Sequence, residues 1–205
     1  MISVIRSGMS AALSDLDVTS NNIANAGTTG YKKREASFVD VYADTVAMGV
    51  GNKVGSGVTT PEMRIMRSQG ELKQTGAVLD LAVEGEGMFT LRNGSNLRDV
   101  LYTRDGSFSI DLNGEIATSD GHKVMSANGM SITVPMRAAG IVTKNGVERL
   151  GLVALTSVGI QPDGTVEATY GGTNIVAVGK IGLATFADAN RLTAIGNNMF
   201  RENAK

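Results

Sequence analysis

The sequence predicts a mainly β protein with a long N-terminal α-helix, in which a coiled-coil-type terminal helix precedes an all-β domain. Apolar side chains recur every three or four residues across residues 2–26, which is the period of one face of a helix. From about residue 70 onward, seven Asn-Gly or Asp-Gly pairs separate short apolar runs. Such pairs accept the positive φ angles of tight hairpin turns, so we expect antiparallel sheet in this part of the chain.

The N-terminal helix is predicted by two interleaved heptad positions that form one stripe along its surface. At about 1.5 Å per residue the helix would be roughly 37 Å long, and Gly27 follows it as a stop signal. The eight residues of this apolar stripe are Ile2, Met9, Leu16 and Ile23 at position a, and Ile5, Ala12, Thr19 and Ala26 at position d. We expect the apolar stripe to be the face through which the chain assembles.

The apolar stripe needs a partner, because an isolated helix of this length is marginal in water. Burial of its five large side chains would contribute roughly 7 to 15 kcal/mol, at about 1.5 to 3 kcal/mol each. A narrow seam with small residues at position d suits another helix; docking on the rest of the same chain is the alternative. No second long heptad pattern follows between residues 27 and 205. We therefore expect the partner helix on another chain or in a C-terminal segment lost from this sequence.

Four segments are predicted along the chain. Residues 1–30 form the assembly helix, and residues 31–69 read as an extended connector with one or two strands. A connector of this length without firm structure is unusual inside a compact domain, so we expect neighbouring molecules to pack around it. Residues 70–200 form the all-β domain, and residues 201–205 form a tail.

The strands of the β domain are expected at apolar or alternating runs between the turn pairs. These runs are residues 79–83, 88–91, 108–112, 131–134, 150–155, 173–178 and 181–186. The turn pairs are Asn93-Gly94, Asp105-Gly106, Asn113-Gly114, Asp120-Gly121, Asn128-Gly129, Asn145-Gly146 and Asp163-Gly164. Strands do not alternate with helices in this pattern, so a parallel α/β sheet is not expected.

The composition disfavours several classes of function. The 205 residues carry a net charge of −1 and only 4% aromatic residues, so no nucleic-acid partner is predicted. The absence of cysteine excludes disulfides, thiolate metal sites and cysteine nucleophiles. No apolar run is long enough to cross a bilayer, so membrane insertion is not predicted either. The N-terminus lacks the basic start and uninterrupted apolar core of a secretory signal.

No catalytic, cofactor-binding or metal-binding residue is predicted. The single histidine, His122, follows a turn and is expected to be exposed and solvated. Asp111, Asn113 and Glu115 alternate like calcium ligands, but the glycine and glutamate that such a loop needs are missing. Gly85-Glu86-Gly87 precedes a strand-like run, so it is a turn and not a phosphate-binding loop. An enzyme is not expected; a secreted β-rich enzyme or carbohydrate-binding module is the alternative from another class.

The most specific signal lies where the helix joins the connector. The residues of this signature junction are Asn22, Ile23, Ala24, Asn25, Thr28, Gly30, Tyr31 and Lys32. They resemble the N-terminal signature of the flagellar rod and hook protein family, Asn-aliphatic-Ala-Asn followed by Thr-x-Gly-aromatic-basic. We expect Asn22 and Asn25 to bond to nearby main chain, and Gly30 to take a positive φ just ahead of Tyr31. Segments near residues 68–89, 102–108 and 182–200 also resemble the family.

The resemblance implies a structural subunit of the bacterial flagellar basal-body rod. Such a subunit assembles with copies of itself and with other rod and hook proteins into the tubular drive shaft and export channel. Export by the flagellar type III apparatus without a cleaved signal, a place in the basal body within the periplasmic space, and no cofactor are also implied. The chain looks most like a proximal-rod protein, and a hook or distal-rod subunit is the alternative. Family members end in a second long helix, whereas this sequence stops at Lys205.

Overall fold

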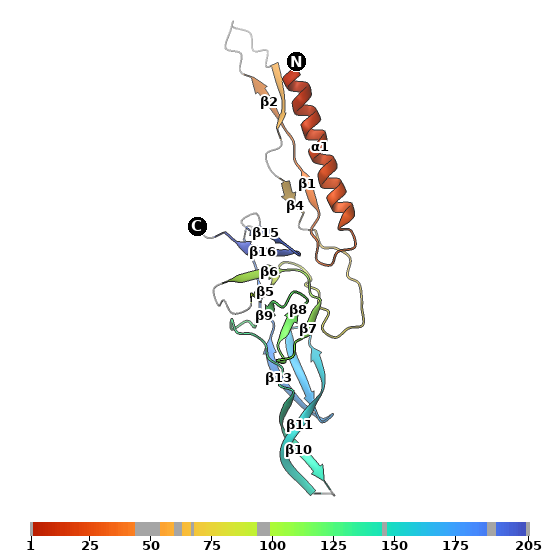
Figure 1. The fold of residues 1–205 in the computed structure, drawn as a ribbon, viewed down its shortest axis with the longest axis vertical. Helices are drawn as coiled ribbons and strands as arrows, with labels where there is room; N and C mark the ends of the chain where they lie inside the picture. Colours follow the sequence, from red (N-terminus) through yellow and green to blue (C-terminus); the bar gives the residue numbers. More distant parts are fainter. Residues whose placement is uncertain are drawn as a thin grey trace. The chain divides into compact units, whose positions relative to one another are not determined.

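The computed structural model describes residues 2–43, 54–59, 63–66, 68–93, 99–144, 147–187 and 192–203 (Figure 1). The chain divides into two compact units, Met1–Ser68 and Gln69–Lys205, which we call the N-terminal unit and the β unit. The N-terminal unit contains α1, and the β unit is built from strands. The predicted fold class, mainly β with a long N-terminal helix, is confirmed.

The helix α1 spans Ile2–Ala24 and ends two residues earlier than predicted. The Asn25 amide still bonds to the carbonyl of Asn21, four residues back, but the Ala26 amide bonds to Ile23, only three residues back. The change from hydrogen bonds across four residues to hydrogen bonds across three tightens the last turn, and the helix ends there. The prediction that Ala26 belongs to the helix is therefore wrong, because Ala26 lies in the turn that follows.

The connector contains more strands than the one or two that were expected. Strand β1 (Arg34–Ala36) pairs with β4 (Met63–Ile65), and β2 (Val39–Ala43) pairs with β3 (Val54–Thr59), both antiparallel. The chain thus runs out through β1 and β2 and returns through β3 and β4. Both β1 and β3 contact α1, so the connector lies along its own helix (Figure 1).

The β unit holds two antiparallel sheets. The larger has the order β15-β16-β6-β5-β9-β8-β7, with β14 also paired to β5, and the smaller has the order β10-β11-β12-β13. The strands of the larger sheet are β5 (Met88–Arg92), β6 (Val100–Thr103), β7 (Phe108–Ile110), β8 (Ile116–Thr118), β9 (Lys123–Val124), β14 (Leu183–Ala184), β15 (Leu192–Gly196) and β16 (Met199–Glu202). Those of the smaller sheet are β10 (Arg137–Lys144), β11 (Val147–Ile160), β12 (Thr165–Tyr170) and β13 (Asn174–Lys180).

The predicted runs and the observed strands agree in part. The runs at 88–91, 108–112, 150–155 and 173–178 lie on β5, β7, β11 and β13. The runs at 79–83 and 131–134 form isolated bridges and not strands, and the run at 181–186 contributes only the two residues of β14. The strands β6, β8, β9, β10, β12, β15 and β16 were not among the predicted runs. Strands β8 and β9 have only three and two residues and carry little signal, whereas β12 alternates as a strand does and was overlooked.

The turn pairs behave as predicted at most of the described positions. Gly114, Gly121 and Gly164 have φ angles of 80°, 81° and 84°, and they join β7 to β8, β8 to β9 and β11 to β12. Gly129, with φ 76°, closes the turn beside the Met125–Ser131 bridge. Asn93-Gly94 and Asn145-Gly146 include residues outside the described ranges.

The pair Asp105-Gly106 was predicted as a turn of the same kind, but its glycine serves another purpose. The Leu81 amide donates to the Gly106 carbonyl at 3.0 Å, so two backbone segments touch here. A Cβ added at Gly106 would lie 1.8 Å from the Leu81 carbonyl oxygen. Gly106 is therefore required by the close approach of the main chains and not by a positive φ.

A hydrophobic core joins the two sheets of the β unit. Its buried members are Phe89, Leu91, Leu101, Phe108, Ile116, Val124, Ile132, Val134, Val166, Ala168, Tyr170, Ile181 and Met199. Phe89 and Phe108 meet edge to face, with ring centroids 5.0 Å apart, a favoured aromatic geometry. The hydroxyl of the buried Tyr170 donates to the Pro135 carbonyl at 2.8 Å, so this hydroxyl is satisfied by a hydrogen bond.

The last described strands, β15 and β16, join the larger sheet through the pairing of β16 with β6. Asn197 and Asn198 have φ angles of 47° and 54°, the conformation of a two-residue turn between β15 and β16. The buried Thr103 hydroxyl donates to the Asn198 carbonyl at 3.0 Å, and Arg201 pairs with Asp99 at 3.0 Å. The segment expected to be a tail from residue 201 therefore begins inside β16, which reaches Glu202.

We predict that Gly106→Ala destabilises the β unit by about 2 kcal/mol or more, because the added Cβ collides with backbone that has no room to move. The measurement is urea unfolding of the full chain followed by far-UV circular dichroism. Gly159→Ala is the control, since that glycine lies in β11 with open space around it, and its effect should stay within about 0.5 kcal/mol. Equal effects of the two changes would contradict the close-approach explanation.

Candidate functional site: the assembly helix and its junction

The helix α1 presents two opposite faces. Ala11 and Val18 are buried, and Ser7, Ser14 and Asn22 are half-buried, on the side that meets the connector. These residues repeat at the same spacings of three and four as the apolar stripe. At about 100° per residue, the two sets are centred about 150° apart. We call the first set the docked face; it is made of small and polar side chains.

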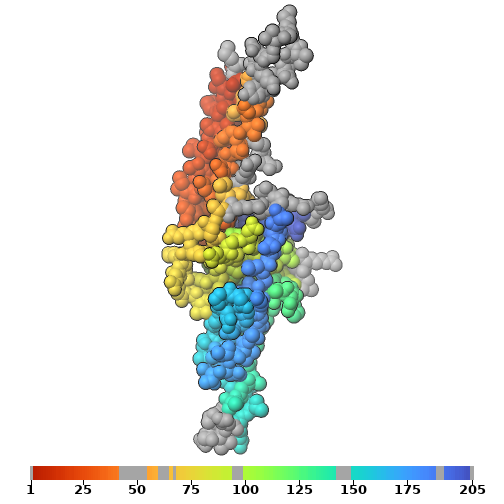
Figure 2. Space-filling model, turned by 180° about the vertical axis from the view of Figure 1, so that it is seen from behind, coloured from red at the N-terminus to blue at the C-terminus, as the bar shows by residue number. Residues whose placement is uncertain are grey.

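The apolar stripe lies on the other side and is largely exposed. The exposed fractions of Ile2, Ile5, Met9, Leu16 and Ile23 lie between 61% and 79%. The described residues of the N-terminal unit do not cover these side chains. Ala12 and Thr19 are exposed on the same side, whereas Ala26 lies beyond the helix. In Figure 2 the connector strands lie along one side of α1 and leave another side open.

The docked face is held near its N-terminal end by Ser7. The Ser7 hydroxyl donates to the Val4 carbonyl at 2.9 Å and accepts from the Val58 amide at 3.3 Å. A Cβ on Gly57, whose φ is 104°, would lie 2.2 Å from the Ser7 Oγ. The glycine therefore lets β3 come close enough for this hydrogen bond to form.

The docked face is held near its C-terminal end by Asn22. The Asn22 Nδ2 group donates to the Arg34 carbonyl at 2.8 Å, and the Arg34 amide donates to the Asn22 Oδ1 at 3.0 Å. The Tyr31 hydroxyl lies 2.9 Å from the same Oδ1 and 3.0 Å from the Asn21 Oδ1. An amide oxygen has two lone pairs, so the Asn22 oxygen can accept from both Arg34 and Tyr31.

The rest of the signature junction completes the turn between helix and connector. The Asn25 Nδ2 group donates to the Asn21 carbonyl at 2.9 Å, which satisfies a carbonyl near the helix end. The Thr28 hydroxyl lies 3.4 Å from the Asn25 Oδ1, and the Lys32 ammonium donates to the Ser68 carbonyl at 2.8 Å. The predicted bonding of Asn22 and Asn25 to nearby main chain is confirmed.

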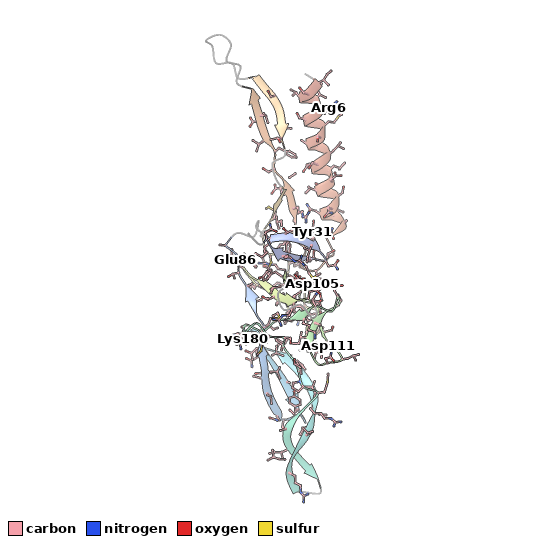
Figure 3. All side chains as sticks on the ribbon, turned by 60° about the vertical axis from the view of Figure 1, so that its left-hand side comes forward. Arg6, Tyr31, Glu86, Asp105, Asp111 and Lys180 are labelled. Carbon is pink, nitrogen blue, oxygen red and sulfur yellow. The ribbon has the colours of Figure 1, made fainter. Side chains whose placement is uncertain are left out.

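The bend at Gly30 has the predicted geometry. Its φ angle is 71°, in the left-handed region that side chains with a Cβ rarely adopt. Tyr31 follows at once and places its hydroxyl against the end of α1 (Figure 3). The chain thus reverses within a few residues, and the first strand of the connector starts at Arg34.

The docked face was missed by the sequence reasoning. Its spacing is the same as that of the apolar stripe, but serine and alanine carry no hydrophobic signal. A search for small residues at heptad spacing (Ser7, Ala11, Ser14 and Val18) would have found it. The partner residue Gly57 lies 50 positions away from Ser7, and a local pattern cannot connect the two.

The residues weighed for catalysis or metal binding form no cluster of that kind. His122, between β8 and β9, is half-buried and not exposed as expected. The Asp111 Oδ1 accepts from the amides of Asn113 and Glu115, both at 2.8 Å, and so shapes the β7–β8 hairpin. Gly85 and Gly87 have positive φ angles in a bend before β5, as predicted for a turn.

The described part of the chain carries neither a metal-binding cluster of acidic, histidine or cysteine side chains nor a helix fit to span a membrane. Among the described residues, no group of three or more histidine, cysteine, aspartate or glutamate side chains could hold a metal ion. The helix in the described ranges is not long and apolar enough to span a membrane. The exposed stripe and the junction are therefore the features from which we argue function.

Comparison with known proteins decides the family. Residues 2–32 match the family described as flagella basal body rod protein, and residues 82–168 match the flagellar hook protein FlgE/F/G D1 domain. The rod protein FlgG of Bacillus subtilis is 32% identical over 206 residues, which cover 96% of this chain and 70% of that protein. FlgG of Caulobacter vibrioides is 33% identical over 210 residues, covering 97% and 72%. The chain belongs to the flagellar basal-body rod protein family.

Membership of the rod protein family makes this chain a structural subunit of the flagellar basal body. The family is not a class of enzymes. A hook protein, FlgE of Helicobacter mustelae, is 40% identical over 129 residues, but these cover 58% of this chain and 28% of the hook protein. The names do not say which section of the rod the relatives occupy, so the expectation of a proximal-rod subunit stays a prediction. The apolar stripe and the signature junction both lie within the rod family match.

We predict that Gly30→Val strains the junction by about 1 to 3 kcal/mol, because a β-branched residue must take a φ near 71°. The bend should fray while the β unit keeps its unfolding midpoint. Amide hydrogen exchange of the full chain measures both, as faster exchange of the Tyr31 and Arg34 amides beside unchanged exchange in β5. Gly27→Val is the control, since Gly27 has open space and no positive φ. Normal exchange at Arg34 in Gly30→Val would contradict the prediction.

Proposed function

We propose that this rod protein assembles through the apolar stripe of α1, which packs against helices of neighbouring axial subunits. The observation that carries the proposal is the exposure of five large apolar side chains in one straight row. A row of this kind is unfavourable in water and has the spacing of a coiled-coil seam. The neighbours are copies of the same chain or other rod and hook proteins.

The proposed contacts are heterologous. In a closed dimer the same surface meets itself, whereas a tube needs one patch of each subunit to meet a different patch of the next. The docked face of α1 is already occupied by the connector, so α1 offers one side to neighbours and keeps the other for itself. This division supports a helical assembly in which terminal helices build the wall of the tube.

The finer parts of the function follow from the same proposal. We propose that the chain acts in the section of the basal body that crosses the periplasm, and that the flagellar type III apparatus exports it without cleaving a signal. It contributes to the drive shaft and export channel as a scaffold and catalyses no reaction. A place in the hook is the second candidate, favoured by the match of 40% identity to a hook protein.

We predict that Leu16→Asp abolishes incorporation into the rod and leaves the β unit folded. Leu16 lies in the middle of the apolar stripe, and burial of an unpaired carboxylate there costs about 3 kcal/mol or more. Swimming motility and the protein content of purified basal bodies measure incorporation, and hydrogen exchange of the core strands β5 and β6 reports on the β unit.

Ser10→Asp is the matched control for Leu16→Asp. Ser10 is exposed on the same helix and lies outside both the apolar stripe and the docked face, so the same charge should be tolerated there. Normal motility of Leu16→Asp would show that the apolar stripe is not the assembly face. Loss of motility in both variants would assign the effect to the added charge and not to the stripe.

A further inference from the structure

We infer that Asn22 is a positioning residue that fixes the rotation of α1 about its own axis, and with it the direction in which the apolar stripe faces. The inference rests on the proposed role of the stripe in assembly. It adds a separate statement, that the stripe is aimed by one side-chain amide on the opposite side of the helix.

The amide of Asn22 occupies the open edge of strand β1. On the other edge of β1, the Met66 amide donates to the Lys33 carbonyl at 2.8 Å, and Arg34 is paired in register with Ile65. Both main-chain groups of Arg34 are taken by Asn22, at 2.8 Å and 3.0 Å. A neighbouring strand would make the same two bonds with its backbone. The side chain of Asn22 therefore closes a strand edge that would otherwise offer unpaired groups.

Asparagine is suited to this position by its chemistry. The contact needs one donor for the Arg34 carbonyl and one acceptor for the Arg34 amide on the same short side chain. Aspartate would lack the donor, and leucine would lack both groups. The Tyr31 hydroxyl, 2.9 Å from the Asn22 Oδ1, uses the remaining lone pair and helps to hold the amide plane in place. Three directional hydrogen bonds, two with the Arg34 main chain and one with the Tyr31 hydroxyl, therefore fix the orientation of the Asn22 amide.

Directional bonds at both ends of one face resist rotation of the helix. Ser7 and Asn22 are 15 residues apart, which is about 22 Å along the axis, and both bond to the main chain of the connector. The side chains between them, Ala11 and Val18, are small or short and would allow the helix to roll. Hydrogen bonds weaken steeply as their angle departs from linear, so a roll of one residue position, about 100°, would break both ends.

The consequence for assembly is geometric. The apolar stripe lies about 150° from the docked face on the same helix, so any roll of α1 turns the stripe by the same angle. A stripe that faces a neighbour at the wrong angle cannot pack against the neighbour's helix, even when α1 itself stays intact. Asn22 therefore acts on the assembly contact without touching it.

The test uses the full chain with Asn22→Leu, and with Ser10→Leu as the control, because Ser10 is exposed on α1 outside the apolar stripe, the docked face and the junction. Leucine has a higher helix propensity than asparagine, so the change does not weaken the helix itself. In Asn22→Leu, exchange of the Arg34 amide should rise on the order of thirtyfold, as expected for the loss of two hydrogen bonds. Helix content should stay the same, and incorporation into basal bodies should fall. In Ser10→Leu, the Arg34 exchange and the incorporation should stay near the parent.

Three results would overturn the inference. Unchanged exchange at Arg34 in Asn22→Leu would mean that the amide does not hold β1. Faster exchange with normal incorporation would mean that it holds β1 but does not aim the stripe. Asn22→Ala removes the amide without adding bulk, so an assembly defect in Asn22→Leu alone would point to a steric clash. The proposed function stands or falls separately, because Leu16→Asp leaves the contact between Asn22 and Arg34 intact.

Discussion

In the assembly that we propose, the N-terminal unit depends on one constraint: a single helix must contact two partners with its two sides. The side that meets the chain's own connector is made of small and polar residues, which let backbone come close and supply hydrogen bonds at Ser7 and Asn22. The opposite side keeps the large aliphatic residues, which gain most from burial. If the chemistry were reversed, the connector would cover the aliphatic row and little apolar surface would remain for a neighbour.

Close approach at glycine is a recurring feature of this fold. Gly57 lets β3 come close to the Ser7 side chain, and Gly106 lets the segment before β7 come close to the Leu81 main chain. In both places the absence of a side chain on the glycine makes room for a neighbouring segment. The high glycine content, 26 of 205 residues, is therefore only partly a matter of turns. A composition rich in glycine and poor in proline favours a fold in which neighbouring segments lie directly on one another.

The parts of the fold that the sequence predicts are those governed by local periodicity. The helix, the antiparallel sheet and the hairpins at Gly114, Gly121 and Gly164 each rest on residues within a few positions of one another. One or two strands were expected in the connector, but their number and pairing could not be predicted, because β1 pairs with β4 across nearly 30 residues. The junction was placed correctly by its asparagines and Gly30, but the identity of the Asn22 partner, Arg34, needed the fold.

The exposed apolar stripe on α1 also makes a free subunit prone to associate before it reaches its place in the rod. Five large side chains whose burial is worth roughly 7 to 15 kcal/mol make a free subunit prone to associate anywhere that another apolar seam is offered. Association also costs several kcal/mol in lost translational and rotational freedom. A stripe that meets its partner at the wrong angle buries too little apolar surface to offset this cost. The place of assembly is then determined by the angle at which the apolar stripe meets its partner, and not by affinity alone. We therefore propose that hydrogen bonds on the polar side of α1 fix its rotation and so set the direction in which a neighbour can add.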